Sequence, residues 1–301
     1  MIISVHRLIS RRPRALLAVA ALLLAVGGGA VAAGRQQTLA AEAPPDAVPL
    51  AIIMYHGILK EASRQGQYII SPALFEEDLQ TIRQQGYTTV VMQDLLDYAD
   101  GLRDLPEKPV MLTFDDGYYN NYLYAYPLLQ KYVMKAVISP VVSWSEQYSE
   151  KDSDHAIYSH VTWEEMREMV ASGLVEIQNH SYDMHYCKAG MRKGTLKRAA
   201  ESTEDYQAAL RRDLSLAQEH LTALVGVTPT TFTYPYGAMC PEALPVIEEI
   251  GFRATLTCES RVNRITRDPA CLMGLGRYLR PSGTSAAAYF SRIFAAVESA
   301  G

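Results

Sequence analysis

Two adjacent carboxylates follow an apolar segment of the chain. The run from Val110 to Phe114 is typical of a buried strand, and Asp115, Asp116 and Gly117 come directly after it. Consecutive side chains of a strand point to opposite faces, so this pair inside the strand would place one charge in the core at a large cost. The pair is therefore expected at the strand end, where Gly117 lets the backbone turn. The alternative is an ordinary solvated Asp-Asp-Gly turn.

Two histidines follow a second predicted strand. The segment from Leu174 to Gln178 leads into a polar stretch that contains His180 and His185. Five residues on an α-helix turn the chain through about 500°, which would separate the imidazoles, whereas a loop can bring both to one ion. Two neutral imidazoles and one carboxylate form a three-ligand set with an open position for water, as in catalytic zinc sites. Either histidine alone would more often be an ordinary hydrogen-bonding residue.

A parallel sheet would bring these side chains together. From residue 50 almost to the end, short apolar runs alternate with amphipathic stretches, a pattern typical of βα units. The predicted strands are 50–55, 88–92, 110–114, 136–140, 174–178, 230–234 and 252–256. Helices are expected to begin near residues 71 and 162, and the longest covers 206–225. This order predicts an α/β fold, a distorted or incomplete (β/α)7-type barrel in a single domain, with its chemistry at the strand ends.

The N-terminal segment indicates export. Four arginines precede an apolar run from Ala15 to Val26, and small residues continue to Gly34. Residues 1–34 are therefore predicted to be a signal peptide, or a membrane anchor if cleavage fails. Residues 35–49 contain three prolines and read as a linker, so the folded domain is expected to span 50–301. The expected location is outside the cell, or on the outer face of the cell membrane or in the wall.

Composition narrows the class of protein and its partners. The 301 residues are 49% hydrophobic and 20% charged, a balance that excludes collagen, disordered and polytopic membrane chains. Beyond residue 34 there are 24 basic and 33 acidic side chains, a formal charge of −9. This charge argues against nucleic-acid binding, which depends on neutralising phosphates. The four cysteines would allow two disulfides in any of three pairings after export, or remain buried free thiols: Cys187, Cys240, Cys258 and Cys271. The oligomeric state stays open.

From Ile52 to about Tyr278 the sequence resembles the polysaccharide deacetylases of the NodB-homology type, also called carbohydrate esterase family 4. Its Thr-Phe-Asp-Asp-Gly segment matches the first motif of that family. The resemblance implies that Asp115 is the catalytic base and that Asp116 binds the metal. The chain also has the start of the second motif at His180, whose two histidines complete the metal set.

The second histidine departs from the usual pattern. Most relatives place it four residues after the first, where this chain has Met184. A thioether is a poor ligand for such a site, so His185 is expected to take the role. The wider spacing resembles the branch that includes poly-β-1,6-N-acetylglucosamine N-deacetylases. That branch uses a histidine on the first strand as general acid, and His56 occupies such a position.

The third motif is also altered. Pro235 and Tyr236 match it, which implies that the backbone N–H of Tyr236 stabilises an oxyanion. The family's usual arginine, the partner of the base, is replaced by Thr233. The resemblance therefore implies an arginine from elsewhere, such as Arg277 or Arg280.

Together these matches imply a metal-dependent N-deacetylase. It would remove acetyl groups from N-acetylglucosamine units of an extracellular or cell-wall polysaccharide, with poly-β-1,6-N-acetylglucosamine as one candidate. Zinc, or another divalent transition metal, would be the cofactor. The alternatives are a deacetylase of peptidoglycan or chitin oligosaccharides, and a wall-associated carbohydrate-binding protein without catalysis.

Overall fold

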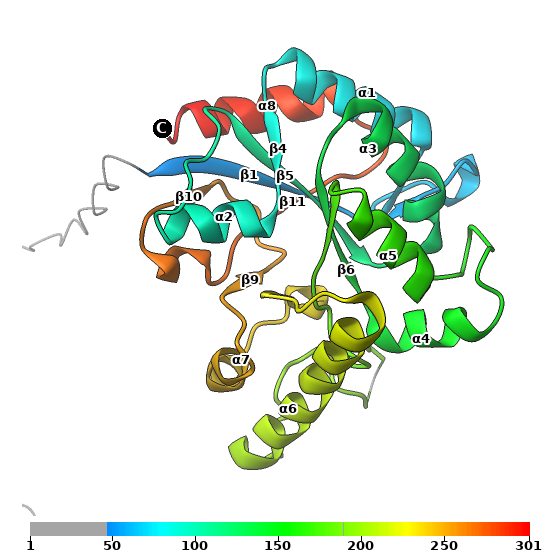
Figure 1. Cartoon of the computed structure of the whole chain (residues 1–301), viewed down its shortest axis with the longest axis vertical. Coiled ribbons are helices and arrows are strands. Elements are labelled where there is room, and N and C mark those ends of the chain that lie inside the picture. The colour runs from blue at the N-terminus through cyan, green and yellow to red at the C-terminus, as the bar shows by residue number, and fades with distance from the viewer. Residues whose placement is uncertain (1–46, 189) are drawn as a thin grey trace, which may run out of the picture. The chain divides into compact units, whose positions relative to one another are not determined.

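Parallel strands form the centre of the fold and helices surround them in residues 47–188 and 190–301, which the computed structural model describes (Figure 1). The strands are β1 Val48–Tyr55, β2 Gly57–Ile58, β3 Ile69–Ile70, β4 Thr88–Val90, β5 Pro109–Asp116, β6 Ala136–Pro140, β7 Val175–Ile177, β8 Thr231–Thr233, β9 Ala254–Leu256, β10 Asn263–Ile265 and β11 Tyr278–Leu279. The helices are α1 Pro72–Gln84, α2 Met92–Ala99, α3 Tyr126–Tyr132, α4 Val142–Glu150, α5 Trp163–Ala171, α6 Thr203–His220, α7 Leu244–Ile250 and α8 Ala286–Glu298.

The largest sheet has seven strands with β5 at its centre. β5 pairs in parallel with β1, β4 and β6, and β6 pairs in parallel with β7. On its other side β1 pairs with β11 in parallel and with β10 antiparallel. β8 and β9 form a separate parallel pair, which single bridges join to segments next to the large sheet: Phe232 pairs with Asn179, after β7, and Leu256 pairs with Leu275, before β11. The predicted α/β fold with an incomplete barrel is therefore confirmed.

Burial on both faces explains the sequence of the central strand. Every residue of β5 is buried, so its apolar residues do not alternate with polar ones until the terminal aspartates. On one face Tyr55, Phe75 and Phe114 form an aromatic cluster with ring centroids 5.1 to 5.5 Å apart. These contacts hold α1 against β1 and β5. The buried strand thus provides a rigid base for the residues at its end.

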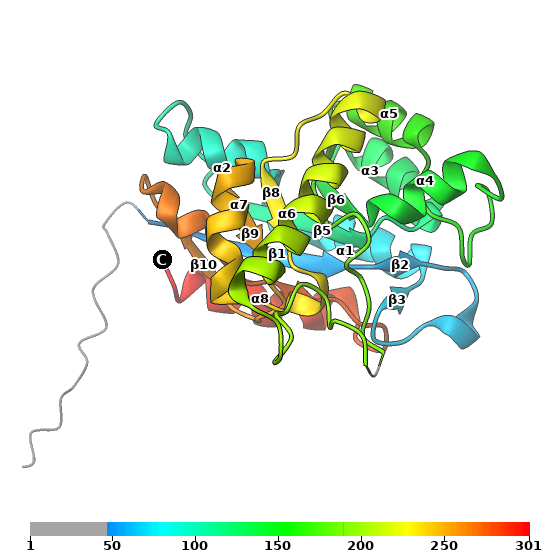
Figure 2. The same cartoon turned by 90° about the horizontal axis from the view of Figure 1, so that it is seen from below.

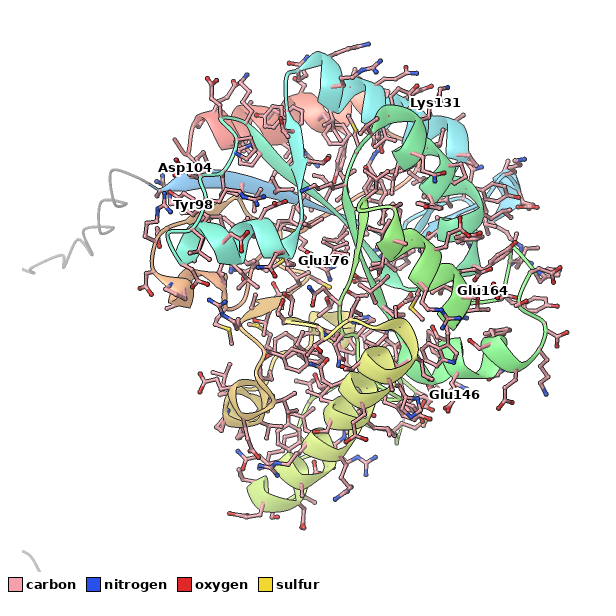
Figure 3. The ribbon with its side chains drawn as sticks, viewed as in Figure 1. Tyr98, Asp104, Lys131, Glu146, Glu164 and Glu176 are labelled. Carbon is pink, nitrogen blue, oxygen red and sulfur yellow. The ribbon has the colours of Figure 1, made fainter. Side chains whose placement is uncertain are left out.

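Local signals in the sequence begin the helices where expected. The Ser71 hydroxyl accepts a hydrogen bond from the backbone of Leu74 at 3.0 Å, and Pro72 is the first residue of α1. Thr162 and Glu165 form a capping box at the predicted start of α5. The start of α2 is capped by another strand. The backbone N–H of Gln93 donates to the carboxylate of Glu176 on β7 at 3.0 Å. Figure 3 labels Glu176 next to α2.

Some boundaries differ from the prediction. The long helix is α6, Thr203–His220, and a π-helical turn over Leu221–Val225 continues it to Gly226 in the left-handed conformation. Strands β2, β3, β10 and β11 were not predicted, because no apolar run of four or more residues marks them in the sequence. Figure 2 shows the β2–β3 pair beyond the end of β1.

The predicted division into segments stays a prediction. The described residues, 47–188 and 190–301, form one compact unit, and β1 begins two residues before the expected start of the domain. The predicted signal or anchor at 1–34, and most of the predicted linker at 35–49, lie outside the described residues. Within residues 47–188 and 190–301, no helix has the length and apolar character needed to cross a membrane.

Candidate metal centre and active site

The two carboxylates are the last residues of β5. Asp115 is 3% exposed and Asp116 is 6% exposed. Asp116 and Gly117 both have left-handed backbone angles, with φ of 69° and 68°, which turn the chain out of the strand. A Cβ on Gly117 would lie 2.7 Å from the Cβ of Pro140, so this turn requires glycine. The predicted strand-end position of the pair is confirmed, and the solvated-turn alternative is wrong.

Asp116, His180 and His185 converge from two strand ends. One possible ligand atom from each lies within 4.8 Å of the others. The Nε2 atoms of His185 and His180 are 3.1 and 3.5 Å from Oδ1 of Asp116. His180 follows β7 and His185 lies on the loop after it, so the loop brings both rings to one carboxylate. The structure therefore brings together the three residues that the sequence suggested as ligands.

The hydrogen bonds around these rings favour a cation between them. Nδ1 of His180 lies 2.7 Å from the carbonyl oxygen of Thr233, which only accepts, so the neutral ring carries its proton there and its Nε2 has a free lone pair. The Tyr236 hydroxyl donates to the carbonyl of His185 at 3.2 Å and lies 3.1 Å from its Nδ1, which fixes the same tautomer. Oδ1 of Asp116 is buried and has no hydrogen-bond partner in the part of the chain that the structure describes. The two Nε2 atoms and Oδ1 of Asp116 thus direct lone pairs at one position, as ligands of a divalent cation do.

Without a metal, a proton is the cation that these groups can share. Burial lowers the pKa of His180, but its close contact with the Asp116 carboxylate and the charges of Asp115 and Asp116 raise it more, so the net shift is upward. Burial raises the pKa of Asp116, yet the two imidazoles outweigh that effect and hold the pKa well below its usual range. Protons and metal ions therefore compete for this site, and metal binding is expected to weaken in acid.

An arginine from the far end of the chain holds the other carboxylate. Nη1 and Nη2 of Arg277 donate to the two oxygens of Asp115 at 2.6 and 2.8 Å. Arg280, three residues later, pairs instead with Asp78 on α1. Burial raises the pKa of Asp115, but the Arg277 charge and hydrogen bonds outweigh it, so the net shift is downward. Arg277 is therefore the arginine partner of Asp115 that the third motif lacks at Thr233. The hydroxyl of Thr233 instead pairs with that of Ser139 at 2.8 Å.

His56 follows β1 and faces the same carboxylates. Its ring centroid lies 4.9 Å from that of Tyr68, and its buried Nδ1 has no hydrogen-bond partner among residues 47–188 and 190–301. Burial lowers the pKa of His56, whereas the charges of Asp115 and Asp116 act to raise it; the net shift is downward. The ring is thus placed to exchange a proton with a group in the cleft.

The carboxylates and histidines line one cleft of about 930 Å³, a volume typical of a small-molecule site. Its lining includes the five residues just described, His56, Asp115, Asp116, His180 and His185, together with Tyr236. Tyr236 follows the buried Pro235, has a φ of 59° and is 38% exposed. Its backbone N–H has no acceptor among the described residues and is available to a ligand.

Several contacts had no local signal in the sequence. The carbonyl of Thr233 and the hydroxyl of Tyr236 orient the histidines, and neither can be inferred from residue type. Two of the four cysteines, Cys187 and Cys258, line the cleft. All four are free thiols, so neither of the two possible disulfides is formed in the structure. Of the groups that support the site, only Arg277 was expected from the sequence, as one of two alternatives with Arg280.

Several known proteins are similar to this chain in sequence and in fold. Residues 102–255 match the family model for polysaccharide deacetylase. The chain is 30% identical over 242 residues to poly-β-1,6-N-acetyl-D-glucosamine N-deacetylase from Escherichia coli (strain K12), a match that covers 75% of this chain but 36% of that protein. It is 27% identical over 197 residues to the protein of the same name from Staphylococcus aureus (strain MRSA252), covering 64% of this chain and 62% of that one. The chain therefore spans less than two thirds of either relative.

Two solved structures extend the similarity over most of the described residues. A de-N-acetylase from Aggregatibacter actinomycetemcomitans superposes with a TM-score of 0.69 at 27% identity, covering 81% of this chain and 99% of that chain. IcaB from Ammonifex degensii superposes with a TM-score of 0.68 at 27% identity, covering 83% and 97%.

Proposed function

The chain belongs to the polysaccharide deacetylase family, and from this premise we propose that it hydrolyses the N-acetyl amide of N-acetylglucosamine units in an extracellular or cell-wall polysaccharide. The observation that carries the proposal is the meeting of two sets of groups in one cleft. One set is a carboxylate paired with Arg277, and the other is the Asp116, His180 and His185 cluster. A binding protein has no need of a buried carboxylate held ionised beside a cation site, whereas hydrolysis of an amide does.

Each group has a place in the reaction. When bound, a divalent cation such as zinc supplies a Lewis acid that polarises the acetyl carbonyl and makes water more acidic. Asp116, His180 and His185 would hold it. Asp115 accepts the proton of the attacking water, and Arg277 keeps that carboxylate ionised and fixes its orientation.

Two further groups act on the acetyl unit and the departing amine. The backbone N–H of Tyr236 donates to the oxygen on which negative charge develops. His56 gives its proton to the nitrogen as the C–N bond breaks, because an amide anion is a poor leaving group. Burial opposes the charged form of His56 while Asp115 and Asp116 support it, so its proton is readily released. The products are acetate and a free amine on the polymer.

Within this reaction class, poly-β-1,6-N-acetylglucosamine is the substrate that we propose. The support comes from the names of the two relatives above and from their likeness over 75% and 64% of this chain. The predicted export segment agrees with an extracellular polymer, and the N-terminal residues could also attach the protein to the membrane.

Acetate release tests the proposal directly. The purified full chain is incubated with poly-β-1,6-N-acetylglucosamine, chito-oligosaccharides and peptidoglycan, and acetate is measured with chelator and after added zinc. We expect release from the first polymer, loss with chelator and recovery with zinc. Asp115→Asn should keep its zinc and lose most turnover, whereas His180→Ala should lose the zinc itself. Acetate release from one of the other glycans alone would show that the proposed substrate is wrong. Binding of a glycan without acetate release would indicate a carbohydrate-binding protein without catalysis.

A further inference from the structure

The loop that carries the second histidine has no regular structure of its own. Residues 179–185 lie between β7 and α6, and Ser181 has a φ of 76°. Such a loop leaves backbone N–H groups that need acceptors from elsewhere. His185 can reach Asp116 only if this backbone stays in one conformation.

A carboxylate on α6 accepts two of these N–H groups. The backbone of Tyr182 donates to Oδ1 of Asp213 at 2.9 Å, and that of Asp183 donates to Oδ2 at 2.8 Å. Both oxygens of one side chain are thus used on consecutive residues of the loop. The two N–H groups lie between His180 and His185 in the sequence, so the contact acts on the segment that connects the two rings.

The helix that carries this carboxylate is firmly held. Leu210 and Leu214, on either side of Asp213 in α6, are fully buried in a cluster with Phe232. The position of Asp213 is therefore set by the core and not by the loop. The loop is also tied to α4, because the hydroxyl of Tyr182 donates to Glu146, which Figure 3 labels where α4 lies next to α6.

We propose that Asp213 is a positioning residue that fixes the loop between the two histidines in the conformation that binds the metal. This inference rests on the proposed function, because it assigns the cluster of Asp116, His180 and His185 to a metal. A carboxylate is needed because it offers an acceptor to each N–H. An asparagine would offer one oxygen and turn its own N–H₂ group toward the other donor.

Zinc binding by the metal-free full chain tests the proposal without reference to activity. The zinc dissociation constant is measured by competition with a chromophoric chelator. We expect Asp213→Ala to raise it about tenfold or more, in line with the effect of groups that support metal ligands. Asp213→Asn should give a smaller increase, and it carries the test if the alanine variant does not fold. An unchanged dissociation constant in a folded variant would overturn the proposal.

Two control variants separate positioning from general stability. Glu219 is exposed on α6, so Glu219→Gln should change neither zinc binding nor thermal stability. Ile293 is buried on α8 in a different part of the core, so Ile293→Ala should lower the melting temperature while zinc affinity stays near that of the wild type. If Ile293→Ala weakened zinc binding as much as Asp213→Ala, loss of stability would explain both and the proposal would fail.

Amide hydrogen exchange measures the contact in the absence of metal. The N–H groups of Tyr182 and Asp183 should be protected in the metal-free wild type and exchange freely in Asp213→Ala. Equal exchange in both proteins would overturn the proposal. A wild type that bound no zinc would instead defeat the proposed function, while the exchange measurement would still decide whether Asp213 holds the loop.

Discussion

Arg277→Met should separate the ionisation of the base from the stability of the fold. The substitution removes both hydrogen bonds to Asp115 and leaves that carboxylate buried without its counter-charge. Breaking a buried pair by removing one partner destabilises a protein by about 3–5 kcal/mol. At about 2–4 °C per kcal/mol for a domain of this size, the melting temperature should fall by about 10 °C at pH 7.

The pH dependence has a definite sign. In the wild type the pKa of Asp115 is below its usual value, so its contribution to stability is present above pH about 3.9 and is lost as the pH falls through the lowered pKa. In Arg277→Met burial acts without opposition from the arginine and raises this pKa. An energy of 3 kcal/mol corresponds to about two pKa units. The variant therefore loses stability as its carboxylate ionises, and its deficit should be smaller at pH 4 than at pH 7.

Two measurements follow the effect. Thermal unfolding of metal-free protein from pH 4 to pH 8 measures stability. Acetate release over the same range follows the ionisation of Asp115. Below neutrality the variant should lose activity at a higher pH than the wild type does. If the deficit in stability were the same at pH 4 and pH 7, and the activity profile did not move, the assignment of Arg277 would be wrong.

The second buried pair offers a matched control. Arg280 binds Asp78 through two nitrogens as Arg277 binds Asp115, but neither Arg280 nor Asp78 lines the cleft. Arg280→Met should therefore reduce stability by a similar amount, while the folded fraction keeps its turnover and pH profile.

Three further substitutions test other parts of the site. His56→Gln should reduce acetate release at least a hundredfold with normal zinc content, because a general acid contributes about 10²–10⁴-fold; activity close to wild type would end its assignment as the acid. Tyr236→Phe keeps the backbone N–H but removes the hydroxyl that orients His185, so zinc affinity by chelator competition should fall about tenfold with turnover at saturating zinc changed little. Gly117→Ala places a Cβ 2.7 Å from that of Pro140 at a φ of 68°, and should lower the melting temperature measurably; an unchanged value would show that the β5–β6 contact can relax.

The sequence predicted the convergence of the site for a simple geometric reason. Asp116 ends β5 and His180 follows β7, and parallel strands end at the same edge of a sheet. Arg277 and Arg280 could not be distinguished in this way, because they lie on either side of the two-residue strand β11. Their directions depend on the pairing of β11 with β1, where Tyr278 lies opposite Ile53. That register is a long-range property and leaves no periodic pattern in so short a segment.

The same limit applies to the supporting hydrogen bonds. Asp213 lies on α6, and its contact with the loop depends on how α6 packs, which hydrophobic spacing alone does not determine. The change from α-helix to π-helical turn at Leu221 also escaped prediction, because Leu221 to Val225 keep the apolar spacing of an α-helix. Residue types and spacing thus predicted which side chains meet in the cleft, whereas packing determined the groups that support them.

The interruption between the two sheets has a consequence for tolerance to substitution. Between β7 and β8 the backbone makes a single bridge, from Asn179 to Phe232, and side chains add the other bonds: Gln178 accepts from the backbones of Thr230 and Thr231, and His180 reaches the carbonyl of Thr233. Backbone pairing survives most replacements, but a bond made by a side chain is lost when that residue changes. In a mutational scan of residue 178, we therefore expect folding yield to fall for nearly every replacement, whichever chemistry the new residue offers.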